Sequence, residues 1–160
     1  MRIEVIEANY LNSKNAEEIV MLLDSYAKDP MGGGNSLNEN VKKNLVEKLS
    51  KLPNAFSLIA YVDNKPAGLA NCFEGFSTFS CKPLVNIHDF AVLPEFRGLR
   101  LSQKLLEKIE KIAISKGCCK VTLEVLSNNN VAKSVYNKFG FSDYQLDQDS
   151  GVALFWEKKL

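Results

Sequence analysis

Residues 89–106 read DFAVLPEFRGLRLSQKLL, and this stretch decides how the whole chain is interpreted. It begins with the pattern of a strand, passes through a turn that contains Arg97 and Gly98, and continues with the periodicity of a helix. A turn that enters a helix leaves backbone N–H groups unpaired at the positive end of the helix dipole. Because such a position suits a phosphate, the stretch alone predicts either an anion site or an ordinary helix start.

Arg100 stands where a phosphate-holding turn most needs a glycine. A residue with a Cβ atom avoids positive φ, because the backbone is strained there. If the backbone at Arg100 is helical, the side chain projects outward and can form a charge-assisted hydrogen bond with a phosphate. If φ is positive, the turn is strained, and a degenerate anion site becomes the better interpretation.

The bulk composition predicts a single globular domain over residues 1–160. Hydrophobic residues make up 46% of the chain and charged residues 24%, an ordinary globular mixture. The net charge of +1 gives no footprint of a nucleic-acid or membrane partner. The first residues alternate between apolar and polar, and no apolar run approaches membrane-spanning length. We therefore expect a cytoplasmic protein with no nucleic-acid and no membrane partner.

The spacing of cysteine and histidine predicts neither a metal site nor a disulfide framework. The cysteines form no C-x-x-C pair, and the single histidine, His88, has no partner at metal-ligand spacing. We expect free and buried thiols at Cys72, Cys81, Cys118 and Cys119.

Hydrophobic periodicity predicts an α+β chain in the order βααβββαβαββ. Ser13 is the expected N-cap of the first helix, and Gly117 and Gly140 are expected to end the last two. The economical architecture is a mixed, mostly antiparallel sheet of about seven strands with four flanking helices. The predicted strands cover residues 2–8, 56–62, 67–79, 84–92, 119–126, 141–146 and 152–158, and the helices cover 13–27, 38–52, 101–116 and 128–140.

Two motifs in this order resemble the central motifs of the GNAT superfamily of N-acetyltransferases. Residues 89–106 resemble its strand, Arg/Gln-x-x-Gly-x-Gly/Ala turn and helix, with Arg100 and Ser102 in place of the two small residues. Residues 123–141, LEVLSNNNVAKSVYNKFGF, resemble its Asn-x-x-Ala-x-x-x-Tyr-x-x-x-Gly-Phe helix. The order of elements along nearly the whole chain matches as well. Residues 75–92 are similar, more loosely, to the polyamine and thialysine acetyltransferase branch.

The resemblance implies a GNAT fold and acetyl-CoA as the donor, with no metal. The usual acceptor in the family is a primary amine, here of a small molecule. An acetyltransferase of protein N-termini or lysines is one alternative, and a non-catalytic CoA-binding module, which Arg100 favours, is another. The resemblance also implies that the strands containing Phe90 and Val121 splay apart around the pantetheine arm, and a homodimer is a family-level expectation.

The resemblance assigns the cofactor site to two stretches of the chain. The amides from Gly98 to Gln103 are expected to hold the pyrophosphate, and Arg97 to shape the turn or add charge. A backbone N–H near Ala91 or Val92 is expected to stabilise the oxyanion. The expected cofactor-binding residues are Phe90, Ala91, Val92, Arg97, Gly98, Leu99, Arg100, Leu101, Ser102, Gln103, Asn129, Asn130, Lys133 and Tyr136.

Tyr136 resembles the general acid of the family. A phenol with a pKa of about 10 can protonate a departing thiolate, whose own pKa is about 8.5. The alternative interpretation is an aromatic side chain that packs in the core from an amphipathic helix.

The base is left open among three candidates. A lysine-like amine has a pKa of about 10.4, so only about one molecule in a thousand is neutral near neutral pH, and a base or water chain is required. An imidazole side chain in general can exchange a proton near neutral pH, which makes His88 a candidate, whereas Asp89 or Glu124 could attract the cationic amine or relay its proton. His88 and Asp89 face opposite sides of a regular strand, which a β-bulge would change. All three could equally be structural or surface groups.

Two further segments are ambiguous. MGGGNS at residues 31–36 lies where the family places an acceptor-binding lid, but a plain connector explains it equally well. Phe73, Phe76 and Phe79 are expected in the core or an interface, with an acceptor pocket as the alternative.

Overall fold

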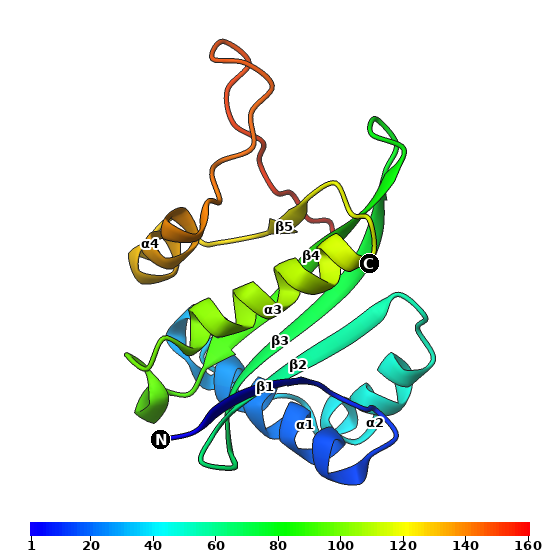
Figure 1. Cartoon of the computed structure of the whole chain (residues 1–160), viewed down its shortest axis with the longest axis vertical. Helices are drawn as coiled ribbons and strands as arrows, with labels where there is room; N and C mark the ends of the chain where they lie inside the picture. Colours follow the sequence, from blue (N-terminus) through cyan, green and yellow to red (C-terminus); the bar gives the residue numbers. More distant parts are fainter. The chain divides into compact units, whose positions relative to one another are not determined.

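The computed structural model describes residues 1–160 and has the predicted α+β order through its fourth helix (Figure 1). The strands are β1 (Ile3–Glu7), β2 (Ala55–Val62), β3 (Lys65–Ser77), β4 (Lys82–Val92) and β5 (Val121–Leu123). The helices are α1 (Ser13–Lys28), α2 (Glu39–Ser50), α3 (Leu101–Ser115) and α4 (Asn130–Phe139), with short 3-10 turns η1 (Pro30–Gly32) and η2 (Pro94–Phe96).

The sheet has five strands in the order β1-β2-β3-β4-β5. The pairings from β1 to β4 are antiparallel and the pairing of β4 with β5 is parallel, so the prediction of a mixed, mostly antiparallel sheet is confirmed. The hairpin between β2 and β3 turns at Asp63 and Asn64, which both have positive φ (47° and 63°). Aspartate and asparagine tolerate this conformation, which the tight hairpin turn requires.

The prediction of about seven strands is wrong, because the two C-terminal strands do not form. In their place the structure has one isolated bridge, between Gln145 and Val152. A lone two-stranded hairpin is at best marginally stable, and here Phe155 and Trp156 remain 74% and 82% exposed. Alternating polarity alone therefore does not predict strands correctly at residues 141–146 and 152–158. Residues 152–158 do not form a strand edge that could pair with a second copy, and a homodimer stays a prediction.

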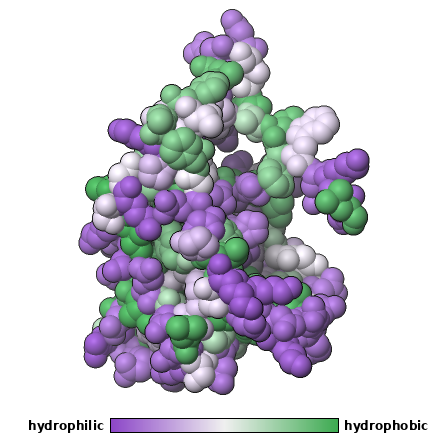
Figure 2. Space-filling model, turned by 90° about the vertical axis from the view of Figure 1, so that its right-hand side faces the viewer, coloured by the Kyte–Doolittle hydropathy of each residue, from purple (hydrophilic) through white to green (hydrophobic).

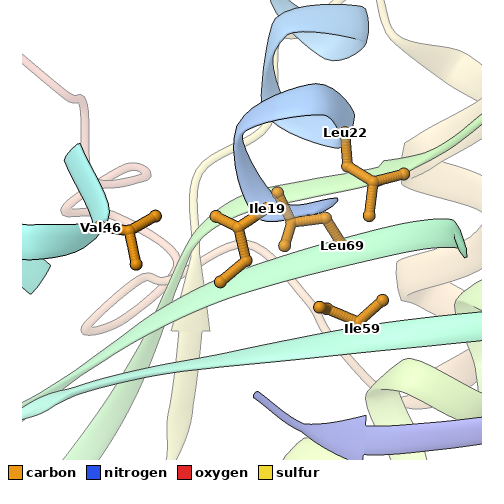
Figure 3. Packing of buried hydrophobic residues seen from close by; sticks show 5 residues of the cluster. All are labelled: Ile19, Leu22, Val46, Ile59 and Leu69. Atoms are coloured by element: carbon orange, nitrogen blue, oxygen red, sulfur yellow. The ribbon is translucent and has the colours of Figure 1, made fainter. Parts of the chain in front are cut away.

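Helices cover both faces of the sheet formed by residues 1–123. Ile19 and Leu22 of α1 and Val46 of α2 pack with Ile59 and Leu69 of the sheet in one buried cluster (Figure 3). The other face carries α3, whose Leu101 packs with Val62 and Ala67. Ile59 and Val62 are three residues apart on β2 and therefore point to opposite faces. Leu105, Leu106, Ile109 and Ala113 of α3 are buried.

Three of the four α-helices begin at an asparagine cap. Asn12 Oδ1 accepts a hydrogen bond from Asn15 N at 3.0 Å, so Asn12, and not the predicted Ser13, caps α1. Asn38 and Asn129 cap α2 and α4 in the same way. Adjacent polar residues compete for the cap, and the chain direction before the helix decides between them.

The chain divides into two compact units, Met1–Leu123 and Glu124–Leu160. The expectation of one domain over residues 1–160 stays a prediction.

The surface is mainly polar on the face drawn in Figure 2, with apolar residues scattered among the charged ones. Phe79 (99% exposed) and Phe76 (59%) are not core residues, contrary to one expectation. The four cysteines are free, but only Cys72 is buried, so the prediction of buried thiols is wrong for Cys81 and Cys119. The structure has no helix with the length and apolar character that crossing a membrane requires.

Candidate functional site

The turn before α3 contains two residues with left-handed backbone. Gly98 has φ of 84°, and Arg100 has φ of 60° and ψ of 25°. Arg100 therefore falls in the strained case, which favours the interpretation as a degenerate, non-catalytic CoA-binding module. A left-handed conformation costs a residue with a Cβ atom about 1–2 kcal/mol. The turns that this stretch resembles have glycine at the same position. Glycine adopts a positive φ without strain, so the backbone angle explains why glycine is preferred there.

The N-terminus of α3 is open. Arg100 is its N-cap residue and makes no side-chain capping hydrogen bond, unlike the asparagines that cap the other α-helices. The hydrogen bond from Lys104 N to Arg100 O begins the helical ladder, so the amides of Leu101, Ser102 and Gln103 precede it. An added Cβ at Gly98 would meet no atom within 4 Å, which leaves open space beside the turn. These features fit a pyrophosphate.

Arg97 shapes this turn. Its Nε donates to Val92 O at 3.3 Å, and its guanidinium NH2 group donates to Asp29 Oδ2 at 3.0 Å. Asp29 also accepts a hydrogen bond from Met31 N at 2.9 Å. The hydrogen bonds from Met31 and then from Arg97 lower the pKa of the Asp29 carboxyl below its usual value. The predicted shaping role of Arg97 thus has a definite partner, which the sequence did not indicate.

The pairing of β4 with β5 ends early. The parallel ladder runs from Val85 and Val121 to Ile87 and Leu123. Beyond Ile87, β4 continues to Val92 with β3 on one edge and no strand on the other. β4 therefore has an unpaired edge at the level of Phe90, Ala91 and Val92, whereas β5 is paired over its whole length, and the expected splay of the two strands stays a prediction.

A β-bulge interrupts β4 beside this opening. Ile87 pairs with Cys72, and Asp89 pairs with the adjacent Asn71, so His88 is an extra residue. In a regular strand Ile87 and Asp89 would share a face. The bulge instead turns Asp89 to the face opposite Ile87.

The bulge also places His88 and Asp89 against the same face of the sheet. Asn71 Nδ2 donates to Asp89 Oδ2 at 2.9 Å, and the His88 ring lies edge-on to Phe73 with centroids 5.6 Å apart. Asn71 and Phe73 are two residues apart on β3 and therefore share a face. In a regular strand His88 and Asp89 would face opposite sides, and the β-bulge changes this.

Asp89 is a half-buried carboxylate without a cationic partner. None of the ion pairs in the chain includes it, and Asn71 is the side chain that donates to it. Burial raises the pKa of Tyr26 on α1, and the charge of Asp89 raises it further. Burial likewise raises the pKa of Cys72 to about 12, with a smaller contribution from Asp89. A negative charge in this setting favours a cation from solution or from a substrate.

The remaining predicted residues lie in the second unit. Tyr136 on α4 is 8% exposed, and its ring lies edge-on to Phe141 with centroids 5.8 Å apart. Gly140 ends the helix with φ of 106°, as predicted. Glu124 is exposed at the start of this unit.

Asn129 and Lys133 already have local hydrogen bonds. Asn129 Oδ1 accepts from Ala132 N at 3.2 Å and caps α4, and Lys133 Nζ donates to Ser127 O at 3.2 Å. Asn130 is the exposed first residue of the helix. Their roles toward acetyl-CoA, like that of Tyr136, stay predictions.

The glycine segment between α1 and α2 is closely built. An added Cβ on Gly32 would lie 1.9 Å from Tyr26 O, so the chain passes too close for any other residue. Asp24 of α1 accepts hydrogen bonds from Ser36 Oγ at 2.7 Å and Leu37 N at 2.8 Å and holds the end of the segment. These contacts fix the connector locally, and a lid role stays a prediction.

The chain is similar to known proteins in sequence and in fold. The model of the acetyltransferase (GNAT) family matches residues 19–141. Thialysine N-ε-acetyltransferases of Bos taurus and Mus musculus are 34% identical over 59 residues, which are 37% of this chain and 35% of each relative. The chain thus spans about a third of the length of the curated relatives it matches.

Solved structures confirm the predicted fold. An aminoglycoside acetyltransferase from an uncultured soil metagenomic sample, in complex with sisomicin, matches with a TM-score of 0.77 and 17% identity over 98% of this chain and 97% of that one. AAC(6')-Iy in complex with a CoA bisubstrate analogue matches with a TM-score of 0.77 and 17% identity over 100% of both chains. At this identity the likeness concerns the fold alone.

Proposed function

The chain belongs to the acetyltransferase (GNAT) family, and on that premise we propose that it transfers the acetyl group of acetyl-CoA to a primary amine of a small molecule. The acceptor class is supported by the relatives, which act on thialysine, and by the aminoglycoside acetyltransferase that shares the fold. Protein N-termini or lysines are the alternative acceptors. A cytoplasmic location is part of the same proposal.

The open start of α3 is the observation that carries the proposal. The amides from Gly98 to Gln103 would hold the pyrophosphate, because the chain provides no capping side chain of its own there. Arg97 would act as a brace of the turn, since its guanidinium is already bonded to Val92 and Asp29. When bound, acetyl-CoA supplies an activated acetyl thioester. The backbone of Ala91 or Val92 at the unpaired edge of β4 would provide the N–H that stabilises the oxyanion.

His88 and Asp89, at the β-bulge of β4, are the proposed residues for binding and deprotonating the amine. An acceptor amine arrives as an ammonium ion, and Asp89 offers a carboxylate that has no cation of its own. His88 lies on the same face and is the nearest candidate for receiving the proton, directly or through water. Glu124 remains a third candidate.

Tyr136 is the proposed proton donor to the departing thiolate. Its placement on α4 before Gly140 matches the family motif, and its ring is buried. Tyr136→Phe should keep the dissociation constant for acetyl-CoA and lower turnover by about tenfold or more. An unchanged turnover number excludes the role.

Thiol release from acetyl-CoA across a panel of amino acids, polyamines, aminoglycosides and peptides tests the function. We expect release with small amines and an acetyl label on the free amine. A label that appears only on peptides favours the alternative acceptors. No calorimetric heat and no thermal shift with millimolar acetyl-CoA would overturn the proposal.

A non-catalytic CoA-binding module is the second candidate, because φ at Arg100 is positive. It predicts heat with acetyl-CoA and no thiol release with any amine. The same panel therefore separates the two candidates.

A further inference from the structure

A chain of buried and half-buried hydrogen bonds crosses three strands and ends at Asp89. Tyr10 OH lies 2.9 Å from Ser57 Oγ on β2, Ser57 Oγ donates to Asn71 Oδ1 on β3 at 2.6 Å, and Asn71 Nδ2 donates to Asp89 Oδ2 on β4 at 2.9 Å. We call these three residues before Asp89 the relay: Tyr10, Ser57 and Asn71.

The carboxylate of Asp89 fixes which group donates in each hydrogen bond of the relay. An ionised carboxylate only accepts, so Asn71 must present its amide nitrogen to Asp89 and its oxygen to Ser57. The single hydroxyl proton of Ser57 then goes to Asn71, and Tyr10 must donate to Ser57. All donors therefore point toward Asp89, an arrangement in which each hydrogen bond polarises the next.

Stability alone does not account for the relay. Ser57 is 0% exposed and Asn71 is 3% exposed, and the other buried side chains of β2 and β3 are apolar. Buried polar groups contribute little net stability over apolar side chains of the same shape, although a half-satisfied group is costly. The relay is fully satisfied, since the chain has no buried side-chain N or O atom without a partner.

The relay and the bulge act on the same carboxylate. The extra residue His88 turns Asp89 to the face of Asn71, and Asn71 then engages one carboxylate oxygen, Oδ2. Oδ1 accepts no hydrogen bond from the chain. Tyr26 and Cys72 are the titratable neighbours whose pKa values Asp89 affects, and neither supplies a positive charge.

We propose that Tyr10, Ser57 and Asn71 are positioning residues that hold Asp89 by one oxygen and leave the other to bind the ammonium group of the acceptor. The proposal rests on the proposed acetyl transfer and extends it, because it says which side chains fix the amine-binding carboxylate. It also implies that the substrate class carries a cationic amine when it binds.

The test compares Asn71→Leu, Asp89→Asn and the double variant in steady-state kinetics with acetyl-CoA and 1,4-diaminobutane. Asn71→Leu removes both hydrogen bonds at similar side-chain size. Each single variant should raise KM for the diamine by about tenfold and leave KM for acetyl-CoA within about twofold. Because Asn71 acts through Asp89, the double variant should behave like Asp89→Asn alone. A further tenfold rise in the double variant, or an unchanged diamine KM in Asn71→Leu, would overturn the proposal.

Tyr61→Phe is the matched control. Tyr61 of β2 is, like Tyr10, a half-buried tyrosine. Its hydroxyl donates to Glu18, so it is not part of the relay. It should change the melting temperature alone. If Asn71→Leu does not fold, Ser57→Ala, which breaks the relay one step earlier, takes its place, with a smaller expected rise in diamine KM.

Crystal structures of the wild type and of the relay variant separate this proposal from the proposed function. We expect the Asp89 side chain to change rotamer in the variant. An unchanged Asp89 rotamer overturns the positioning role even if the enzyme is active. A wild type that transfers no acetyl group overturns the proposed function, while the two crystal structures still decide whether the relay positions Asp89.

Discussion

The starts of α1 and α3 solve the same problem in opposite ways. Asn12 closes α1 with a hydrogen bond from Asn15 N at 3.0 Å, and the backbone of Asn12 is extended. Arg100 opens α3 from a left-handed backbone without any side-chain cap. Both helices are amphipathic and bury one side, so packing does not explain the difference. The chain caps α1, and it leaves α3 uncapped at the place where we propose that the pyrophosphate of acetyl-CoA binds.

The largest expected effect comes from a charge placed at the open start. Ser102→Glu should lower acetyl-CoA affinity by at least about tenfold, because the carboxylate repels the pyrophosphate. The same charge at the positive end of the helix dipole should stabilise the fold by about 0.3–1 kcal/mol. Calorimetry and thermal melting measure the two effects. Ser102→Gln, similar in size and uncharged, is the control, and a Glu variant that binds as tightly as the Gln variant would refute the assignment.

The converse change removes the cap of α1. Asn12→Ala should destabilise the protein by about 1 kcal/mol, because an amide of the first turn loses its acceptor. Urea unfolding measures this loss. Acetyl-CoA affinity should stay as in the wild type, and a parallel loss of affinity would mean that the two helix starts are not independent.

Arg100→Gly relieves the left-handed strain at the open start. Glycine removes a penalty of about 1–2 kcal/mol but adds flexibility to the unfolded chain, so we expect a net stabilisation of about 0.5–1 kcal/mol. Arg100→Ala keeps the strain and removes only the charge. Comparing the acetyl-CoA affinity of the two variants shows whether the guanidinium assists the phosphates, and equal melting temperatures would argue against strain at this residue.

The smallest expected effect concerns Asp29, which braces Arg97. The folded pKa of Asp29 is lowered, so its contribution is present at neutral pH, above the unfolded pKa, and is lost as the pH falls through the folded pKa. Asp29 is exposed enough that Asp29→Asn should lose only a few tenths of a kcal/mol near pH 7. The difference from the wild type should shrink as the pH falls below about 4. Urea unfolding at both pH values checks this, and a difference that is constant with pH would contradict it.

The sequence predicted the features that depend on local pattern. The periodicity from Leu101 onward placed α3, and the glycines at 117 and 140 ended two helices as expected. The sequence shows that Arg100 replaces the glycine of the family motif, but it does not show the backbone angle of Arg100. A φ value depends on how the turn joins a strand and a helix whose positions are set by the core.

The features that the sequence did not predict depend on contacts between distant residues. The bulge at His88 is visible only in the pairing of β4 with β3, where the adjacent residues Asn71 and Cys72 lie opposite Asp89 and Ile87. Asn71 itself gave a usable signal, since it is the polar residue inside the apolar run AGLANC at 67–72. A polar side chain in a strand buried on both faces needs a partner. That rule would have indicated the site, though not Asp89 as the partner.

Asp29 joins two loops that lie far apart in the sequence. Its carboxylate accepts hydrogen bonds from Met31 N, at the start of the α1–α2 connector, and from Arg97, in the turn before α3. The amide proton of Met31 is therefore protected from exchange while its hydrogen bond to the Asp29 carboxylate is formed. Hydrogen–deuterium exchange at Met31 is thus a reporter on the turn before α3: a phosphate that orders the turn should slow exchange at an amide it never touches.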